Sequence, residues 1–182
     1  MLHIKHFKLM ALYNRRMNDQ LIQAAHTLTD EQLIEDKGAF FSSILGTFNH
    51  LIIGDLIWLL RFSKHSNRYQ SLSELSELPY PSSLDEILFN QFEDLIDVRQ
   101  RLDRTILHWL NKEAQECDFH KTLSYSNSLG ERSTREFSEL VSHLFNHQTH
   151  HRGQLSTLFN QLRIDIGSTD FLLDIPDLNQ HR

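Results

Sequence analysis

The sequence predicts an all-α protein with the architecture of a four-helix bundle. Apolar residues recur at helical spacing along four stretches, each roughly 20–30 residues long. Only 6 glycines and 3 prolines occur in 182 residues, so few helix breakers interrupt those stretches. Two long connections separate the predicted helices, as in bundles with crossover connections. We therefore expect a single helical domain over residues 1–182.

The N-terminal third of the chain contains the first two predicted long helices. Apolar residues at near-helical intervals place the first at His3–Ala25. Thr29, with Gln32 three residues later, is a capping signature, so a short helical turn should begin there. The second long helix is predicted over residues 40–62 and is apolar around most of its circumference. Such a helix is expected to be buried in the bundle.

Residues 84–114 form the third predicted helix, with apolar residues recurring from Leu84 to Trp109. The loop before it, residues 63–82, contains two prolines and ends in serines that commonly open a helix. The second long connection, residues 115–133, shows an alternation that allows a short hairpin or an extended pair.

Thr134 is predicted to cap a fourth helix that ends near Arg163. Gly167 is a helix-stop signal, and the tail after it should be irregular. We interpret the two long connections, residues 63–82 and 115–133, as the rims of a ligand pocket.

Composition argues against several classes of protein. The 18 basic and 24 acidic residues give a net charge of −6, which disfavours a nucleic-acid-binding face. A single cysteine, Cys117, rules out an internal disulfide and any CxxC motif. The N-terminal segment lacks the apolar core of a signal peptide, and the longest apolar run has about half of the roughly 20 residues that cross a bilayer. We expect a cytoplasmic protein without nucleic-acid or membrane partners.

Histidines are unusually frequent, with 12 in the chain and four of them between positions 143 and 151. His147 and His151 stand four residues apart, so on a helix their side chains diverge by only about 40° and point the same way. That spacing lets two imidazoles reach one metal ion. His143 lies one further turn back, and His150 lies to one side of His147. A polar, solvated helix face explains the same spacing equally well.

The second predicted long helix carries two polar residues inside an apolar run. His50 has Ile53 and Ile57 beside it on the helix, so its imidazole should be buried and need a partner. A backbone carbonyl or an aspartate would satisfy it as well as a metal ion. Asp55 is crowded by apolar neighbours, so we expect it to pair with a histidine ligand or with an arginine such as Arg152.

Gly54 and Gly153 interrupt two predicted helices beside these histidines. A glycine inside a helix costs about 1 kcal/mol relative to alanine. We expect the cost to reflect close approach of helix backbones or room for a ligand, and the alternative is that neither glycine has a specific role.

Two motifs together resemble the DinB/YfiT-like family of metal-dependent proteins. The first is HLIIGDLIW, residues 50–58, and the second is HLFNHQTHHRGQL, residues 143–155. The second is the more specific, because it contains the pattern Asn-His-x-x-x-His-Arg-Gly-Gln. The resemblance covers essentially the whole chain, and it implies an up-down-down-up four-helix bundle.

The same resemblance implies one divalent metal ion held by three histidines, which here are His50, His147 and His151. His143 and His150 fall outside this triad, as supporting or surface residues. Three imidazoles leave a divalent ion at least one open position, which is typical of catalytic rather than structural sites. We expect zinc first, and nickel, manganese and iron stay open, because imidazole ligation does not select among them.

Several members of this family are thought to use low-molecular-weight thiols such as bacillithiol, mycothiol or glutathione, and such proteins commonly form homodimers. We therefore expect a metalloenzyme with a small-molecule substrate, of the thiol-dependent transferase or hydrolase type. The alternative is a non-catalytic, metal-stabilised binding or scaffold protein of a stress response, in line with the damage-inducible label of the family. A third alternative is a purely structural histidine cluster without a metal.

The remaining residues that stand out have simpler interpretations. Cys117 lies in a polar connection without an evident activating charge, so it is a poor candidate for a nucleophile. Trp58 is expected in the core or in a pocket wall. Arg15 and Arg16 are expected on a solvated helix face rather than in an anion site.

Overall fold

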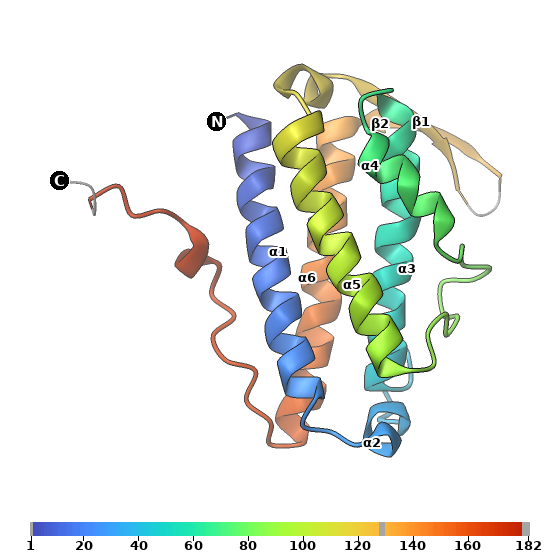
Figure 1. Ribbon diagram of the computed structural model, residues 1–182, viewed down its shortest axis with the longest axis vertical. Coiled ribbons are helices and arrows are strands. Elements are labelled where there is room, and N and C mark those ends of the chain that lie inside the picture. The colour runs from blue at the N-terminus through green and yellow to red at the C-terminus, as the bar shows by residue number, and fades with distance from the viewer. Residues whose placement is uncertain (1, 128–129, 180–182) are drawn as a thin grey trace.

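The computed structural model describes residues 2–127 and 130–179. In this part of the chain the protein is mostly helical, with one small two-stranded antiparallel sheet. Four long helices lie side by side, with α1 and α6 running in one direction and α3 and α5 in the other (Figure 1). Their bounds are α1 (His3–Ala25), α3 (Ile44–Phe62), α5 (Phe92–His108) and α6 (Phe137–Gln161).

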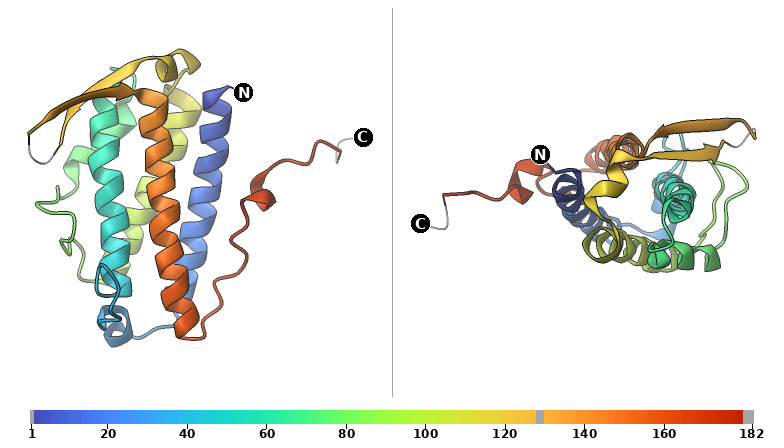
Figure 2. Two further views of the ribbon diagram at one scale, coloured as in Figure 1. Left: turned by 180° about the vertical axis from the view of Figure 1, so that it is seen from behind. Right: turned by 90° about the horizontal axis from the view of Figure 1, so that it is seen from above.

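Shorter elements connect the long helices. Two are α-helical, α2 (Asp30–Ile34) and α4 (Gln70–Ser73), and the sheet consists of β1 (Thr122–Ser126) and β2 (Arg132–Glu136). The 3-10 segments are η1 (Ser63–His65), η2 (Glu74–Glu77), η4 (Glu116–His120) and η5 (Phe171–Asp174), and η3 (Trp109–Glu113) is a π-helical turn. The β1–β2 hairpin lies at the end of the molecule where α6 begins (Figure 2).

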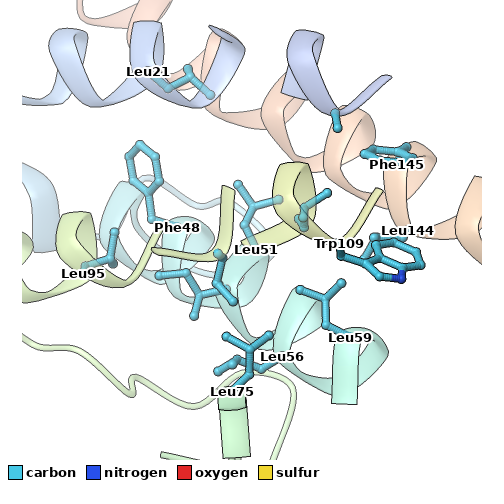
Figure 3. Packing of buried hydrophobic residues seen from close by; sticks show 14 of the residues in the cluster. Leu21, Phe48, Leu51, Leu56, Leu59, Leu75, Leu95, Trp109, Leu144 and Phe145 are labelled. Carbon is cyan, nitrogen blue, oxygen red and sulfur yellow. The ribbon is translucent and has the colours of Figure 1, made fainter. Parts of the chain in front are cut away.

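The long helices share one apolar core (Figure 3). Leu51 and Leu59 of α3 and Trp109 of η3 are fully buried in it. The segment Ile44–His65 is long and apolar enough to span a membrane by length and composition, yet 78% of its apolar window is buried among the other elements. The apolar character of α3 is therefore explained by packing inside the protein, as predicted.

The prediction for the N-terminal helix is confirmed at both ends. α1 spans His3–Ala25, and Thr29 forms the predicted capping box with Gln32 at the start of α2. The Thr29 hydroxyl accepts the Gln32 backbone N–H at 3.3 Å, and the Gln32 side-chain oxygen accepts the Thr29 N–H at 2.9 Å. These bonds satisfy donors that the first turn of a helix leaves unpaired.

The second long helix begins later than predicted, at Ile44 rather than at residue 40. Ser43 is its N-cap, and the Ser43 hydroxyl accepts the backbone N–H of Gly46 at 3.0 Å. Ser42 has a φ of 59°, a left-handed conformation that a right-handed helix does not contain. The helix therefore cannot extend back through Ser42.

The third long helix begins later than predicted, and its last turn is π-helical rather than α-helical. It spans Phe92–His108, whereas the apolar spacing predicts residues 84–114. Residues 84–91 form bends and turns instead, because Asn49 on α3 binds the backbone of Phe89. The Phe89 N–H donates to Asn49 Oδ1 at 2.9 Å, and Asn49 Nδ2 donates to the Phe89 carbonyl at 3.1 Å. Beyond α5 the chain continues as the π-helical turn η3.

The predicted hairpin is confirmed, but the predicted helix cap after it is wrong. β1 and β2 pair antiparallel with Ser124 opposite Thr134, and the two hydroxyl oxygens lie 2.7 Å apart. Thr134 therefore belongs to β2, and α6 begins only at Phe137. The cross-strand hydrogen bond gives the Thr134 hydroxyl a partner, in place of the backbone N–H of a first helical turn that it would bind as a helix cap.

The C-terminal tail runs back beside α1 and is irregular apart from η5, as predicted (Figures 1 and 2). Arg16 on α1 holds it by an ion pair with Asp174 at 2.6 Å. Arg16 also donates to the carbonyls of Ser168 and Asp170, each at 2.9 Å. The prediction of a solvated face is therefore wrong for Arg16, while Arg15 is exposed as expected.

Glu116 on η4 anchors the start of α1. Its carboxylate accepts the backbone N–H groups of Ile4 and His3, each at 3.0 Å. The hydrogen bond from Ile4 is the largest cause that lowers the pKa of Glu116 from 4.5 to about 2. Because the pKa of Glu116 is lower in the folded state, its ionised carboxylate stabilises the folded protein. This stabilisation is complete above about pH 4.5 and is lost as the pH falls toward about 2.

Glu116→Gln should remove this pH-dependent part of the stability. Thermal unfolding should give a Tm difference between wild type and variant that is largest near about pH 6 and shrinks toward about pH 2. A Tm difference that stays constant over this range would contradict the role assigned to the carboxylate charge.

Candidate metal centre

Three histidines from two helices meet inside the protein. His50 extends from α3, and His147 and His151 extend from successive turns of α6. Nε2 of His50 lies 3.0 Å from Nε2 of His147 and 3.2 Å from Nε2 of His151. One ring nitrogen of each residue lies within 4.8 Å of the others. The four-residue spacing thus puts both imidazoles of α6 on the face that meets α3.

Burial keeps the three imidazoles neutral. It is the largest cause that lowers the pKa of each of them. His147 lies among the other histidines, and its pKa falls to about 3. Neutral imidazole is the form that ligates a metal ion, so these side chains need not lose a proton first at neutral pH.

Hydrogen bonds to the outer ring nitrogens orient two of the imidazoles. His50 Nδ1 donates to the Leu84 carbonyl at 2.8 Å, and His151 Nδ1 donates to the Gln154 side-chain oxygen at 2.7 Å. A neutral imidazole that donates from Nδ1 carries its lone pair on Nε2. The Nε2 atoms of His50 and His151 lie 3.2 Å apart. Their lone pairs repel each other unless a cation lies between them, so the arrangement suits a metal ion.

The donor set also suits a divalent ion. Among the residues that the structure describes, no carboxylate or thiol joins the three imidazoles, so coordination positions stay open. Phe41 covers one side, with its ring centre 3.8 Å from that of His50 and 5.4 Å from that of His151. Phe41 could not be predicted from the sequence as part of the site, because its position depends on the left-handed turn at Ser42 rather than on helical spacing.

Gly54 leaves the space that His147 occupies. A Cβ at position 54 would lie 2.7 Å from Cε1 of His147, which is closer than non-bonded carbons approach. Gly54 therefore has a specific role, but the group that approaches it is a side chain and not the predicted helix backbone. Close approach of a backbone is also wrong at Gly153, where no described atom outside the helix backbone lies within 4 Å of the Cβ position.

Gly54→Ala should weaken metal binding by about 10–100-fold, because His147 must move away from the other two ligands. Gly153→Ala is the matched control, since it also places alanine inside a helix. It should leave metal affinity unchanged and stabilise the protein by about 0.5–1 kcal/mol. Calorimetric titration with zinc and thermal unfolding measure the two effects, and equal zinc affinity of both variants would show that the site does not need Gly54.

The comparison with known proteins covers nearly the whole chain. The family model of the DinB family matches residues 2–179. The chain belongs to the DinB family. It is similar to Protein DinB of Bacillus subtilis (strain 168), with 27% identity over 159 residues that make up 87% of each chain. It is also similar to the uncharacterized protein YizA of the same organism, with 26% identity over 161 residues, 88% of this chain and 90% of YizA.

Membership of the DinB family and the three-histidine group together fit a metal-binding protein. His143 and His150 do not join that group. The His143 ring packs against Trp58 with 5.0 Å between ring centres, and the His150 ring meets His151 edge-on at 4.8 Å. Burial, followed by the charge of Arg61, lowers the pKa of His143. Both residues therefore lie beside the three-histidine group, and both side chains are exposed.

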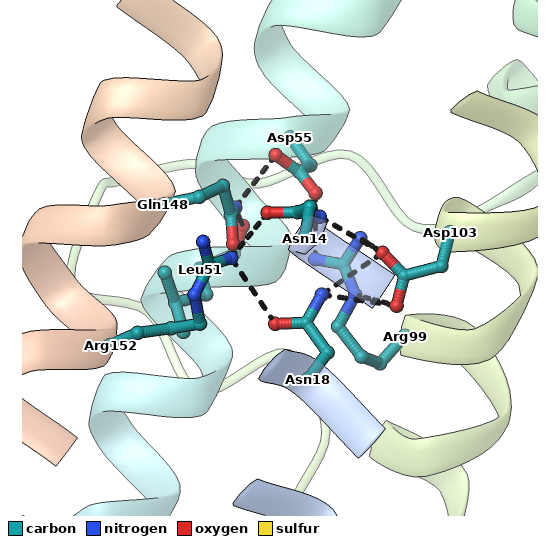
Figure 4. A network of polar contacts seen from close by, with 8 residues as sticks. All are labelled: Asn14, Asn18, Leu51, Asp55, Arg99, Asp103, Gln148 and Arg152. Atoms are coloured by element: carbon teal, nitrogen blue, oxygen red, sulfur yellow. Dashed lines mark hydrogen bonds and ion pairs between the residues drawn. The ribbon is translucent and has the colours of Figure 1, made fainter. Parts of the chain in front are cut away.

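Asp55 is paired, as predicted, but its partner is Arg99 of α5 rather than Arg152 (Figure 4). Asp55 Oδ2 lies 2.6 Å from Nη1 of Arg99, and both side chains are fully buried. Gln148 of α6 donates to Asp55 Oδ1 at 2.7 Å and to a backbone carbonyl of α3 at 2.9 Å. Because Gln148 directly follows His147, these bonds hold the histidine-bearing turn of α6 against α3.

Arg152 belongs to the same buried network (Figure 4). It donates to the side-chain oxygens of Asn14 and Asn18 on α1. Both asparagines in turn donate to Asp103 on α5, at 3.1 and 2.9 Å. Burial lowers the pKa of Arg152 to about 10, so its charge persists at neutral pH. Two arginines and two aspartates thus balance one another and connect all four long helices beside the histidines.

An open cavity of about 1100 Å³ lies close to His50, although none of the three histidines lines it. Leu84, whose carbonyl accepts the hydrogen bond from His50, is one of its lining residues. Lys64 and Tyr80 line it from the first long connection, and Ser124 lines it from the second. The prediction that both connections form pocket rims is therefore confirmed.

Proposed function

We propose that this DinB-family protein is a metal-dependent enzyme that acts on a small molecule. The supporting observation is the convergence of His50, His147 and His151 without a fourth protein ligand among the described residues. Structural zinc sites usually have four protein ligands, whereas catalytic sites have three and keep a position open. The open position and the cavity close to His50 favour a catalytic role over that of a metal-stabilised scaffold.

A divalent ion at this site would supply a Lewis-acidic centre that lowers the pKa of a bound water or thiol. Zinc is the first candidate, and nickel, manganese and iron are the others. The protein's own residues hold the ligands ready, because the Leu84 carbonyl orients His50 and Gln154 orients His151. The reactions that fit are transfer of a low-molecular-weight thiol to a small electrophile and hydrolysis of such an electrophile.

We also propose that the four long helices form an up-down-down-up bundle as one domain, in a cytoplasmic protein. α1 and α6 run opposite to α3 and α5, which is the order of directions that this topology requires (Figure 1). α5 and α6 each pack against both α1 and α3, and these contacts close a ring of helices around the core.

Elemental analysis of untagged protein, purified without chelator, tests the metal site. We expect about one metal ion per chain, and we expect His50→Ala to lose it. The ion found is then used in assays with panels of thiols and small electrophiles. Turnover that is absent from His50→Ala supports the enzyme, whereas bound metal without turnover favours the scaffold. Absence of metal after reconstitution with zinc, nickel and manganese would refute the site.

A further inference from the structure

We propose that the cavity beside the histidine site binds the anionic group, a carboxylate or a phosphate, of a small organic substrate. The inference rests on the proposed function, because it names the substrate class of the same site. An anion site is indicated by the three cationic side chains that line this cavity, namely Arg61, Lys64 and Arg132. They come from the end of α3, from η1 and from β2.

The charge of the cavity is opposite to that of the chain. The protein has a net charge of −6, yet no aspartate or glutamate is among the described residues that line this cavity. Within residues 2–127 and 130–179, none of the three cations forms an ion pair with an acidic side chain. Unpaired charges of one sign in a concave site focus the electrostatic potential and attract a ligand of the opposite sign.

Arg61 is held in a fixed position by its neighbours. Its guanidinium carbon lies 4.7 Å from the ring centre of Trp58 and 4.9 Å from that of Tyr125. Nη2 donates to the Ser126 carbonyl at 3.0 Å. A guanidinium has five N–H donors, so most of them stay available for a ligand. Because this planar guanidinium group is already held in position, it loses little conformational entropy when it binds an oxyanion through two hydrogen bonds.

The cavity lies close to His50, although none of the three histidines lines it. Leu84 lines the cavity, and its carbonyl accepts the hydrogen bond from His50 Nδ1 at 2.8 Å. Ile57, which stands two turns after His50 on α3, also lines the cavity. A volume of about 1100 Å³ is large enough for a small organic molecule. A molecule anchored through its anionic group can therefore extend along Ile57 as far as Leu84, next to His50.

Anion binding by the full-length protein as purified tests the inference. Isothermal titration calorimetry at low ionic strength would use succinate and inorganic phosphate as probes, with succinamide as the uncharged analogue. We expect saturable binding of at least one oxyanion, weakening with added salt, and no binding of succinamide. The ratio of the succinate and phosphate affinities distinguishes a carboxylate from a phosphate as the preferred group.

Substitution of the cations locates the binding site. Arg132→Gln and Lys64→Gln should each weaken binding at least about tenfold, because each removes a charge-assisted hydrogen bond. Both side chains are exposed, so folding should not depend on them. Arg104→Gln is the matched control, because it removes an exposed arginine of α5 that does not line the cavity. Equal weakening in Arg104→Gln, equal binding of succinamide, or no oxyanion binding by wild type would overturn the proposal.

Metal content measured on the same samples separates this inference from the proposed function. Arg132→Gln and Lys64→Gln should retain the metal content of wild type. His50→Ala should lose the metal and still bind the oxyanion. Oxyanion binding by a protein without metal contradicts only the proposed metal site, and metal binding without oxyanion binding contradicts only this inference.

Discussion

His151→Ala should lower metal affinity at least about 100-fold, because two imidazoles remain where three converged. His147→Ala should have the same effect, since its Nε2 lies 3.0 Å from that of His50. The loss of metal affinity should exceed that caused by substituting a residue that only orients a ligand, such as Gln154. Elemental analysis and competition with a chromophoric chelator measure occupancy and affinity in both variants.

His150→Ala is the matched control for these substitutions. Its ring contacts His151 and it stands on the same helix, but its side chain is exposed and does not join the three-histidine group. We expect metal content and stability close to wild type, as for most surface substitutions. Equal metal loss from His150→Ala and His151→Ala would put the ligand assignment in error.

Asp55→Ala should lower the free energy of unfolding by about 3–5 kcal/mol, the usual cost of removing one partner of a buried ion pair. Arg99 would keep Asp103 at 3.0 Å but would lose the closer carboxylate at 2.6 Å. Gln148 would lose its side-chain acceptor at 2.7 Å. Urea unfolding followed by circular dichroism measures the change.

Two further variants make this stability prediction specific. Asp97→Ala removes an exposed carboxylate from α5 and should change the free energy of unfolding by less than about 0.5 kcal/mol. Asp55→Asn keeps the side-chain shape and an acceptor for Gln148, so it isolates the effect of the charge. A loss below about 1 kcal/mol in Asp55→Ala would mean that Asp103 alone satisfies Arg99, contrary to expectation.

Features that depend on neighbours in the sequence could be predicted from it. The bounds of α1 and the capping box of Thr29 and Gln32 depend on residues within one or two helical turns. The shared direction of His147 and His151 likewise follows from their four-residue spacing. None of these features requires knowledge of what packs against the helix.

Contacts between distant segments decided the elements that were predicted wrongly. Residues 84–91 have the apolar spacing of a helix, but Asn49 binds the Phe89 backbone and holds this segment in bends and turns. Thr134 has a side chain that often caps helices, but its hydroxyl is hydrogen-bonded to the hydroxyl of Ser124 on the opposite strand. Local propensity is a weak preference, and a hydrogen bond from another element overrides it.

Some features of the metal site likewise follow from the sequence, and others depend on the tertiary structure. The sequence by itself determined which histidines were candidates, their spacing, and the need of buried Asp55 for a partner. Only the tertiary structure decided that the imidazoles of two helices converge, that Arg99 rather than Arg152 pairs with Asp55, and that three cations share one cavity. A helix sets the direction of its side chains from its own geometry, whereas contacts between helices depend on how the whole core packs.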